Sequence, residues 1–217
     1  MTVTLTPDQQ DVVTELMNLG VGRAADAFSR LVGDEVLLSV PDVLFCSQEQ
    51  AQTHLQATDS GQMAGVMQTF SGFATGTAAL IFPGPRSMEL VRLVVGDDLP
   101  AEDISELEQE TLAELGNIIL NHCLATIGNT LQAEVRASLP ETYRGLWPEM
   151  FEAFHRITPV PPVPAGADQE DTLVMLVQID FTLRSRNLRG YLAFLIDMNA
   201  AQIFLSLIDR YLENLSG

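Results

Sequence analysis

The sequence predicts a single α/β domain over residues 1–217, built from an internal duplication. Seven of the 27 residues from Glu15 to Pro41 recur without a gap at an offset of 99. Two long helical patterns alternate with short β-branched runs that are typical of strands. A chain of 217 residues with 47 % hydrophobic content is also long enough to bury a sizeable core. We therefore expect repeats at about 7–96 and 103–215.

The repeats share both polar and apolar positions. The matched pairs are Glu15/Glu114, Leu16/Leu115, Asn18/Asn117, Glu35/Glu134, Val36/Val135, Ser39/Ser138 and Pro41/Pro140. Further along, the offset rises to about 113, so the second repeat contains an insertion. We place it as a loop within 141–170, where a run of prolines disfavours regular structure after about 158, and we expect its aromatic residues to cover an edge of the core.

The first long helix is predicted from Pro7 to Val32. Thr6 is suited to the N-cap, Gln9 to the capping-box position and Gly33 to the C-terminal stop. Apolar residues at helical spacing form its expected buried stripe: Val12, Val13, Leu16, Leu19, Ala27 and Leu31.

The second long helix is predicted to begin near Asp103 or Ser105 and to end near Thr130, with shorter helices at 85–95 and 198–214. Six runs read as strands: 35–40, 63–70, 76–82, 134–139, 172–181 and 190–196. Six strands of this length can form one antiparallel or mixed sheet.

Composition excludes several classes of function. All 11 basic residues are arginines, so a Walker lysine, a Schiff-base lysine and a Ser-Lys dyad are impossible. A formal charge of −18 disfavours nucleic acids and anionic membranes, which favours a protein partner. The N-terminus lacks signal-peptide features and no apolar run approaches ~20 residues, so we expect a cytoplasmic protein.

Metal and disulfide chemistry also find little support. The three histidines lack the i,i+4 spacing of a zinc site. Cys46 and Cys123 are too far apart in sequence to suggest a C-x-x-C site, so we expect free core thiols.

Each long helix carries a row of polar residues on one face, because residues three and four apart are neighbours there. The rows are Asp11, Glu15, Asn18 and Gly22 in the first repeat, and Glu110, Glu114, Asn117 and Asn121 in the second. A solvated stripe would explain one such row. The return of the same Glu and Asn in repeats that otherwise diverged favours a functional role.

An asparagine amide cannot act as a general base, but it can hold a water molecule by accepting and donating hydrogen bonds. That ability suits hydrolysis of an acyl phosphate on another protein, where the remaining task is to place water in line with phosphorus. A neighbouring carboxylate could pair with a cationic side chain of the partner.

The pattern D-x-x-x-E-x-x-N, followed after 22 residues by proline, resembles the signature of the chemotaxis CheC/CheX/FliY phosphatase family. It is formed here by Asp11, Glu15, Asn18 and Pro41. A second copy, with Glu114, Asn117 and Pro140, fits a CheC-like two-site layout, although Glu110 replaces the usual Asp or Ser. With the duplication and the strand GTAALIFP, the resemblance covers most of the chain.

The resemblance implies a pseudo-two-fold α/β fold with a mostly antiparallel sheet and two long helices side by side on one face. It further implies hydrolysis of the aspartyl phosphate of a CheY-like response regulator. Asn18 and Asn117 would orient water, and Glu15 and Glu114 would pair with the regulator's lysine. The regulator would supply Mg²⁺, so no cofactor or metal is expected on this chain. The deamidase CheD is a further candidate partner, and we expect a monomer.

Two alternatives remain at this point. A non-catalytic CheC-like adaptor would bind a response regulator or another signalling protein without turning it over. An unrelated acidic α/β domain would use its carboxylates for a divalent ion, although no D-x-D or calcium-loop spacing supports this.

Overall fold

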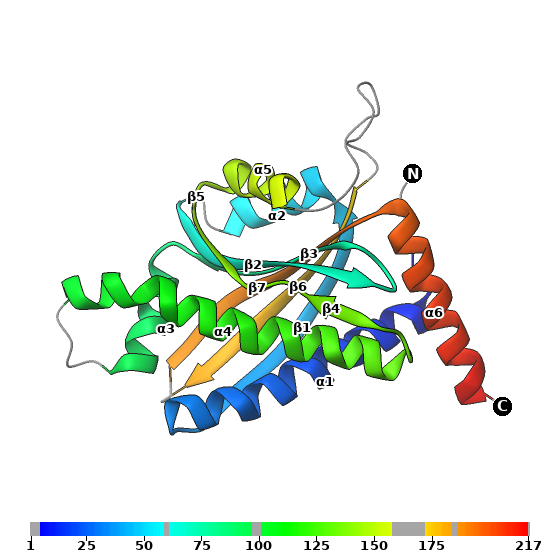
Figure 1. Ribbon diagram of the computed structural model, residues 1–217, viewed down its shortest axis with the longest axis horizontal. Coiled ribbons are helices and arrows are strands. Elements are labelled where there is room, and N and C mark those ends of the chain that lie inside the picture. The colour runs from blue at the N-terminus through cyan, green and yellow to red at the C-terminus, as the bar shows by residue number, and fades with distance from the viewer. Residues whose placement is uncertain (1–4, 59–60, 97–100, 158–171, 184–185, 217) are drawn as a thin grey trace.

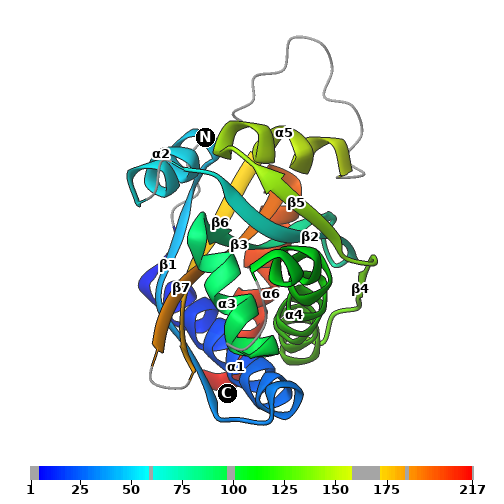
Figure 2. The ribbon, with the colours of Figure 1, turned by 90° about the vertical axis from the view of Figure 1, so that its left-hand side faces the viewer.

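A seven-stranded sheet runs through the centre of the molecule, with helices on both of its faces (Figures 1 and 2). The computed structural model describes residues 5–58, 61–96, 101–157, 172–183 and 186–216. The elements in chain order are α1 (Pro7–Val32), β1 (Val36–Ser47), α2 (Gln48–Thr58), β2 (Met63–Gly72), β3 (Gly76–Pro83), α3 (Pro85–Val95), α4 (Ala101–Thr130), β4 (Val135–Ala137), β5 (Glu141–Gly145), α5 (Trp147–Ile157), β6 (Thr172–Leu183), β7 (Arg186–Asp197) and α6 (Met198–Ser216).

The strands are ordered β1-β6-β7-β3-β2-β4, β5 also pairs with β2, and each of these pairings is antiparallel. This confirms the predicted α/β class with a mostly antiparallel sheet. The edge strand β1 of the first half pairs with β6 of the second half, and β4 and β5 of the second half pair with β2 of the first. Each half therefore completes the sheet of the other.

Helix α1 follows its sequence signals closely. The Thr6 hydroxyl accepts a hydrogen bond from the Gln9 backbone N–H at 3.2 Å, and the Gln9 side chain accepts one from the Thr6 N–H at 2.9 Å. This capping box satisfies two backbone donors that a helix start leaves free. The helix ends at Gly33, whose φ of 67° is left-handed and favours glycine.

Helices α1 and α4 pack against each other on the same face of the sheet (Figures 1 and 2). At Gly20 the two backbones come so close that a Cβ atom there would lie 2.8 Å from the Cα of Cys123. The buried stripe of α1 differs from the predicted one, because Leu19 and Leu31 are 43 % and 47 % exposed. Gly20 faces α4 instead, and the buried stripe comprises Val13, Leu16, Met17, Gly20, Val21, Ala24, Ala25 and Phe28.

The opposite face of the sheet is covered by α2 and α5, two helices of 11 residues each (Figure 2). Neither was predicted. Trp147, Phe151 and Phe154 of α5 are buried against this face. The expectation that these aromatic residues cover the core is correct, but 141–157 forms a strand and a helix rather than a loop. The proline-rich part, 158–170, lies outside the described residues.

Other predicted boundaries also shift. The second long helix begins at Ala101, ahead of Asp103. The strand predicted at 134–139 is shortened to β4, and β5 forms a further strand after Pro140 that was not predicted. Seven strands result instead of six. With β4 and β5 counted as one interrupted strand, the two halves run through the same order of helices and strands, and α2 and α5 begin 99 residues apart. An origin by duplication stays a prediction.

Candidate functional site

The first polar row lies on the exposed face of α1, where Asp11, Glu15 and Asn18 all face solvent. The opposite face of this helix is apolar and buried, so the helix phase itself turns the row outward. The Asn18 Oδ1 accepts a hydrogen bond from the backbone N–H of Val40 on β1 at 3.3 Å. The helix row is thereby joined to the edge strand beside it.

A proline-containing bulge in β1 explains why Val40 can donate to a helix side chain. The pairing of β1 with β6 shifts register between Ser39 and Asp42, which is a β-bulge. Pro41 lies in this bulge, and it has no N–H to give to a ladder. The Asn–x₂₂–Pro spacing therefore places the bulge beside the asparagine.

The second row lies on α4, with Glu110 and Glu114 exposed and Asn117 half-buried. The Asn117 Oδ1 accepts two side-chain hydrogen bonds, from Gln68 Nε2 at 3.3 Å and from Asn121 Nδ2 at 2.7 Å. Gln68 comes from β2 and is completely buried. Its Nε2 also donates to the Ser138 carbonyl at 3.1 Å.

The edge strand is interrupted beside Asn117 as well. Strand β4 ends at Ala137 and β5 resumes at Glu141, so that Ser138 to Pro140 face only Gln68 and Thr69 of β2. The Ser138 hydroxyl accepts a hydrogen bond from the Thr69 N–H at 3.1 Å, which anchors the interruption. Both asparagines thus lie beside a proline-containing break in an edge strand.

The two rows belong to opposite ends of the sheet, because β1 is the first strand in the order and β4 the last. The structure therefore brings Glu15 together with Asn18, and Glu114 with Asn117, but it keeps the two pairs apart. Each pair is directed away from the core, as the resemblance implied, although Asn117 is less exposed than Asn18.

Sequence reasoning gave no role to Gln68, which contacts Asn117 from another element. Its signal was available as the one amide in the apolar strand run MAGVMQTF. Buried amides are usually hydrogen-bonded, so this residue predicted a polar partner but not its identity.

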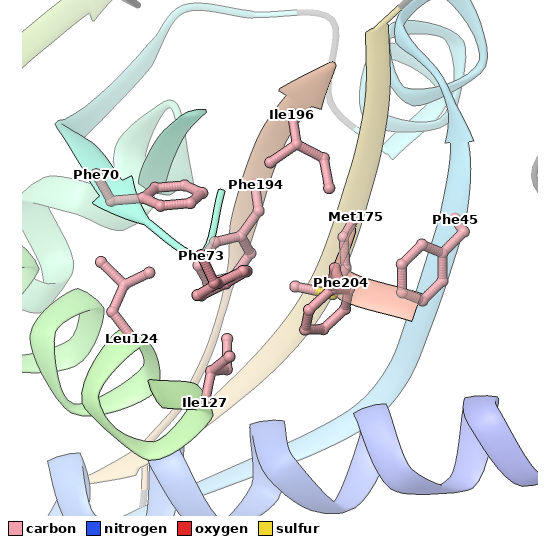
Figure 3. A pocket seen from close by; sticks show the side chains of 9 residues that line it. All are labelled: Phe45, Phe70, Phe73, Leu124, Ile127, Met175, Phe194, Ile196 and Phe204. Carbon is pink, nitrogen blue, oxygen red and sulfur yellow. The ribbon is translucent and has the colours of Figure 1, made fainter. Parts of the chain in front are cut away.

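Two other kinds of site find no comparable support. Among the described residues, no group of three His, Cys, Asp or Glu side chains is arranged to hold a metal ion. An apolar cavity lies between the sheet, α4 and α6 (Figure 3). Its lining is formed by Phe45, Phe70, Phe73, Leu124, Ile127, Met175, Phe194, Ile196 and Phe204. These side chains offer no group that could orient a polar ligand or activate water.

None of the helices in the described ranges combines the length and the apolar character that crossing a membrane requires.

The first row lies in the part of the chain that matches a known family. Residues 9–44 match the model of the CheC-like family, and this stretch contains Glu15, Asn18 and Pro41. The chain is also 26 % identical over 137 residues to the "CheY-P phosphatase CheC" of Bacillus subtilis (strain 168). That match covers 62 % of this chain and 65 % of the Bacillus protein.

Solved structures share the fold. FliY of Thermotoga maritima matches with a TM-score of 0.70 at 17 % identity, over 96 % of this chain and 100 % of the FliY chain. The FliM middle domain from H. pylori matches with a TM-score of 0.59 at 10 % identity, over 94 % of this chain and 99 % of the FliM domain. At these identities the likeness concerns the fold.

Proposed function

Because this chain belongs to the CheC/CheX/FliY family, we propose that it hydrolyses the aspartyl phosphate of a CheY-like response regulator. The observation that carries the proposal is that each long helix presents a Glu-x-x-Asn row beside a proline-containing break in an edge strand. The B. subtilis relative, described as a CheY-P phosphatase, supports the substrate class.

The chemistry asks little of this chain. An acyl phosphate already has a good leaving group, so the main tasks are to position water and to stabilise charge. The amide of Asn18 or Asn117 would hold the attacking water, and the regulator would contribute its own Mg²⁺ to offset the phosphoryl charge.

The carboxylates would set the orientation of the complex. Glu15 and Glu114 lie one helical turn from their asparagines and are exposed, so each can reach a lysine of the regulator. Exposed apolar side chains lie beside both rows, with Leu19 43 % exposed and Leu139 85 % exposed. They would add apolar contact around the ionic one.

The test is the decay rate of phosphorylated response regulators with Mg²⁺, with and without this protein. We expect faster decay, and we expect the double variant Asn18→Ala/Asn117→Ala to abolish the acceleration. Asn129→Ala is the matched control, because Asn129 is an exposed asparagine of α4 outside both rows. Unchanged decay despite phosphorylation-dependent binding would instead establish the adaptor function.

CheD remains a second candidate partner, and we expect the protein alone to be a monomer. Sedimentation of the protein alone and with CheD from the same organism tests both expectations.

A further inference from the structure

We propose that the two asparagine sites differ in activity. Asn121 and Gln68 are positioning residues that occupy the side-chain oxygen of Asn117, so that it cannot accept a hydrogen bond from water. In this view Asn18 carries most of the turnover. The inference rests on the proposed phosphatase function, and it concerns how that function is divided between the two helices.

The carbonyl oxygen of the Asn117 side chain is fully used. A carbonyl oxygen has two lone pairs, and the Asn117 Oδ1 accepts from both Gln68 and Asn121. A nucleophilic water must donate one O–H so that its own lone pair can point at phosphorus. To accept that O–H, Asn117 would first have to give up one of its two hydrogen bonds.

The network fixes which way the amides point. The Ser138 carbonyl can only accept, so the Gln68 atom facing it must be the amide nitrogen. The second N–H of that nitrogen is directed at Asn117, which must therefore present its oxygen. Gln68 is completely buried, so it has no alternative contact with solvent.

The corresponding positions around Asn18 lack both side-chain donors. Position 22, which is 99 residues before Asn121, is a glycine. Asp42 and Glu141, which are 99 residues apart, pair with Gln178 and Met67 in the sheet. The residues that follow these partners, Ile179 and Gln68, therefore occupy corresponding positions. Ile179 is a buried apolar side chain. Within the described part of the chain, Asn18 Oδ1 accepts one bond, from the Val40 N–H, which leaves a lone pair for water.

Packing does not explain why position 22 is a glycine. A Cβ atom at Gly22 would meet nothing within 4 Å, and the residue is exposed in the middle of a helix. Glycine costs about 1 kcal/mol there relative to alanine. The sequence thus omits a side chain one turn from Asn18, at the position where Asn121 holds Asn117.

The experiment measures kcat and KM for regulator dephosphorylation in single-site proteins. Asn117→Ala leaves the α1 site, and Asn18→Ala leaves the α4 site. We expect Asn18→Ala to lower kcat tenfold or more, and Asn117→Ala to lower it twofold at most. Adding Asn121→Ala to Asn18→Ala should raise kcat at least threefold with little change in KM, because it frees one lone pair of Asn117.

The reciprocal change installs a donor beside Asn18. In the Asn117→Ala background, Gly22→Asn should lower kcat at least threefold, and Gly22→Ala, which adds no donor, should lower it less. Adding Asn121→Ala to Asn117→Ala should not raise kcat, because the Asn117 side chain that Asn121 contacts is then missing. Thermal unfolding of each variant verifies that it is folded.

Equal losses from Asn18→Ala and Asn117→Ala would overturn the inference and leave the phosphatase function standing. So would an Asn121→Ala variant that fails to raise kcat in the Asn18→Ala background. If the wild-type protein does not accelerate decay at all, the proposed function itself fails, and the inference fails with it.

Discussion

The two faces of the sheet are built differently. The face under α1 and α4 holds the larger apolar cluster, and its helices turn polar rows outward. The face under α2 and α5 holds a smaller cluster in which Trp147, Phe151 and Phe154 are buried. The sheet thus separates the surface proposed to act on a partner from the layer that covers its other face.

The largest effect is expected from Trp147→Ala on the α5 side. Trp147 is 1 % exposed, and truncating a buried aromatic residue of this size costs about 3–5 kcal/mol. Denaturant unfolding should show this loss, and Glu152→Ala, an exposed change on the same helix, should stay within about 0.5 kcal/mol. Turnover per folded molecule should be unchanged. A loss of turnover beyond the unfolded fraction would show that the two faces are coupled.

A pair of glycines tests the packing of α1 on α4. Gly20→Ala should destabilise by about 1–3 kcal/mol, because its methyl group would collide with the backbone of Cys123. Gly22→Ala, half a turn away, should stabilise by up to about 1 kcal/mol, because nothing lies within 4 Å. Equal shifts in the midpoint of thermal unfolding would refute the assigned contact.

Each face also carries one free thiol, which gives a pH test. Burial raises the pKa of Cys46 to about 11 and that of Cys123 to about 12, above the ordinary ~8.5. Because the fold favours the neutral thiol, this stability is present below about pH 8.5. As pH rises from about 8.5 toward 11, this stability is lost, and each thiol accounts for about 1.4 kcal/mol for every pH unit.

Unfolding under reducing conditions at pH 8 and pH 10 measures this loss. Cys46→Ala and Cys123→Ala should each remove one thiol's share of the alkaline slope. A slope that neither variant changes would show that other groups cause it.

The smallest effect separates the two asparagines. Asn18→Ala should change the free energy of unfolding by less than about 0.5 kcal/mol, because Asn18 is exposed and water can replace it as the acceptor of the Val40 N–H. Asn117→Ala should cost about 1 kcal/mol, because it leaves an N–H of buried Gln68 without its acceptor. The double variant Asn117→Ala/Gln68→Leu should lose less free energy of unfolding than the sum of the two single variants, since the two side chains share one hydrogen bond.

Helix α1 and helix α5 show how far local signals reach. The ends of α1 follow from contacts between residues three or four apart, as in the Thr6–Gln9 capping box, so the sequence predicted them correctly. Helix α5 was missed because a short helix is marginal by itself and owes its stability to the sheet beneath it. The stripe of α1 was misjudged at Leu19 and Leu31, because Gly20, which contacts α4, carries little hydrophobic signal.

The candidate site divides in the same way. The pairing of Glu15 with Asn18, and of Glu114 with Asn117, is a matter of helical spacing, and the sequence alone determined it. The hydrogen bonds around each amide were decided by tertiary structure, because Gln68 reaches Asn117 from a strand 49 residues away and Val40 reaches Asn18 from a bulge. Helical periodicity fixes which residues share a face, but only the packed sheet determines which donors and acceptors that face meets.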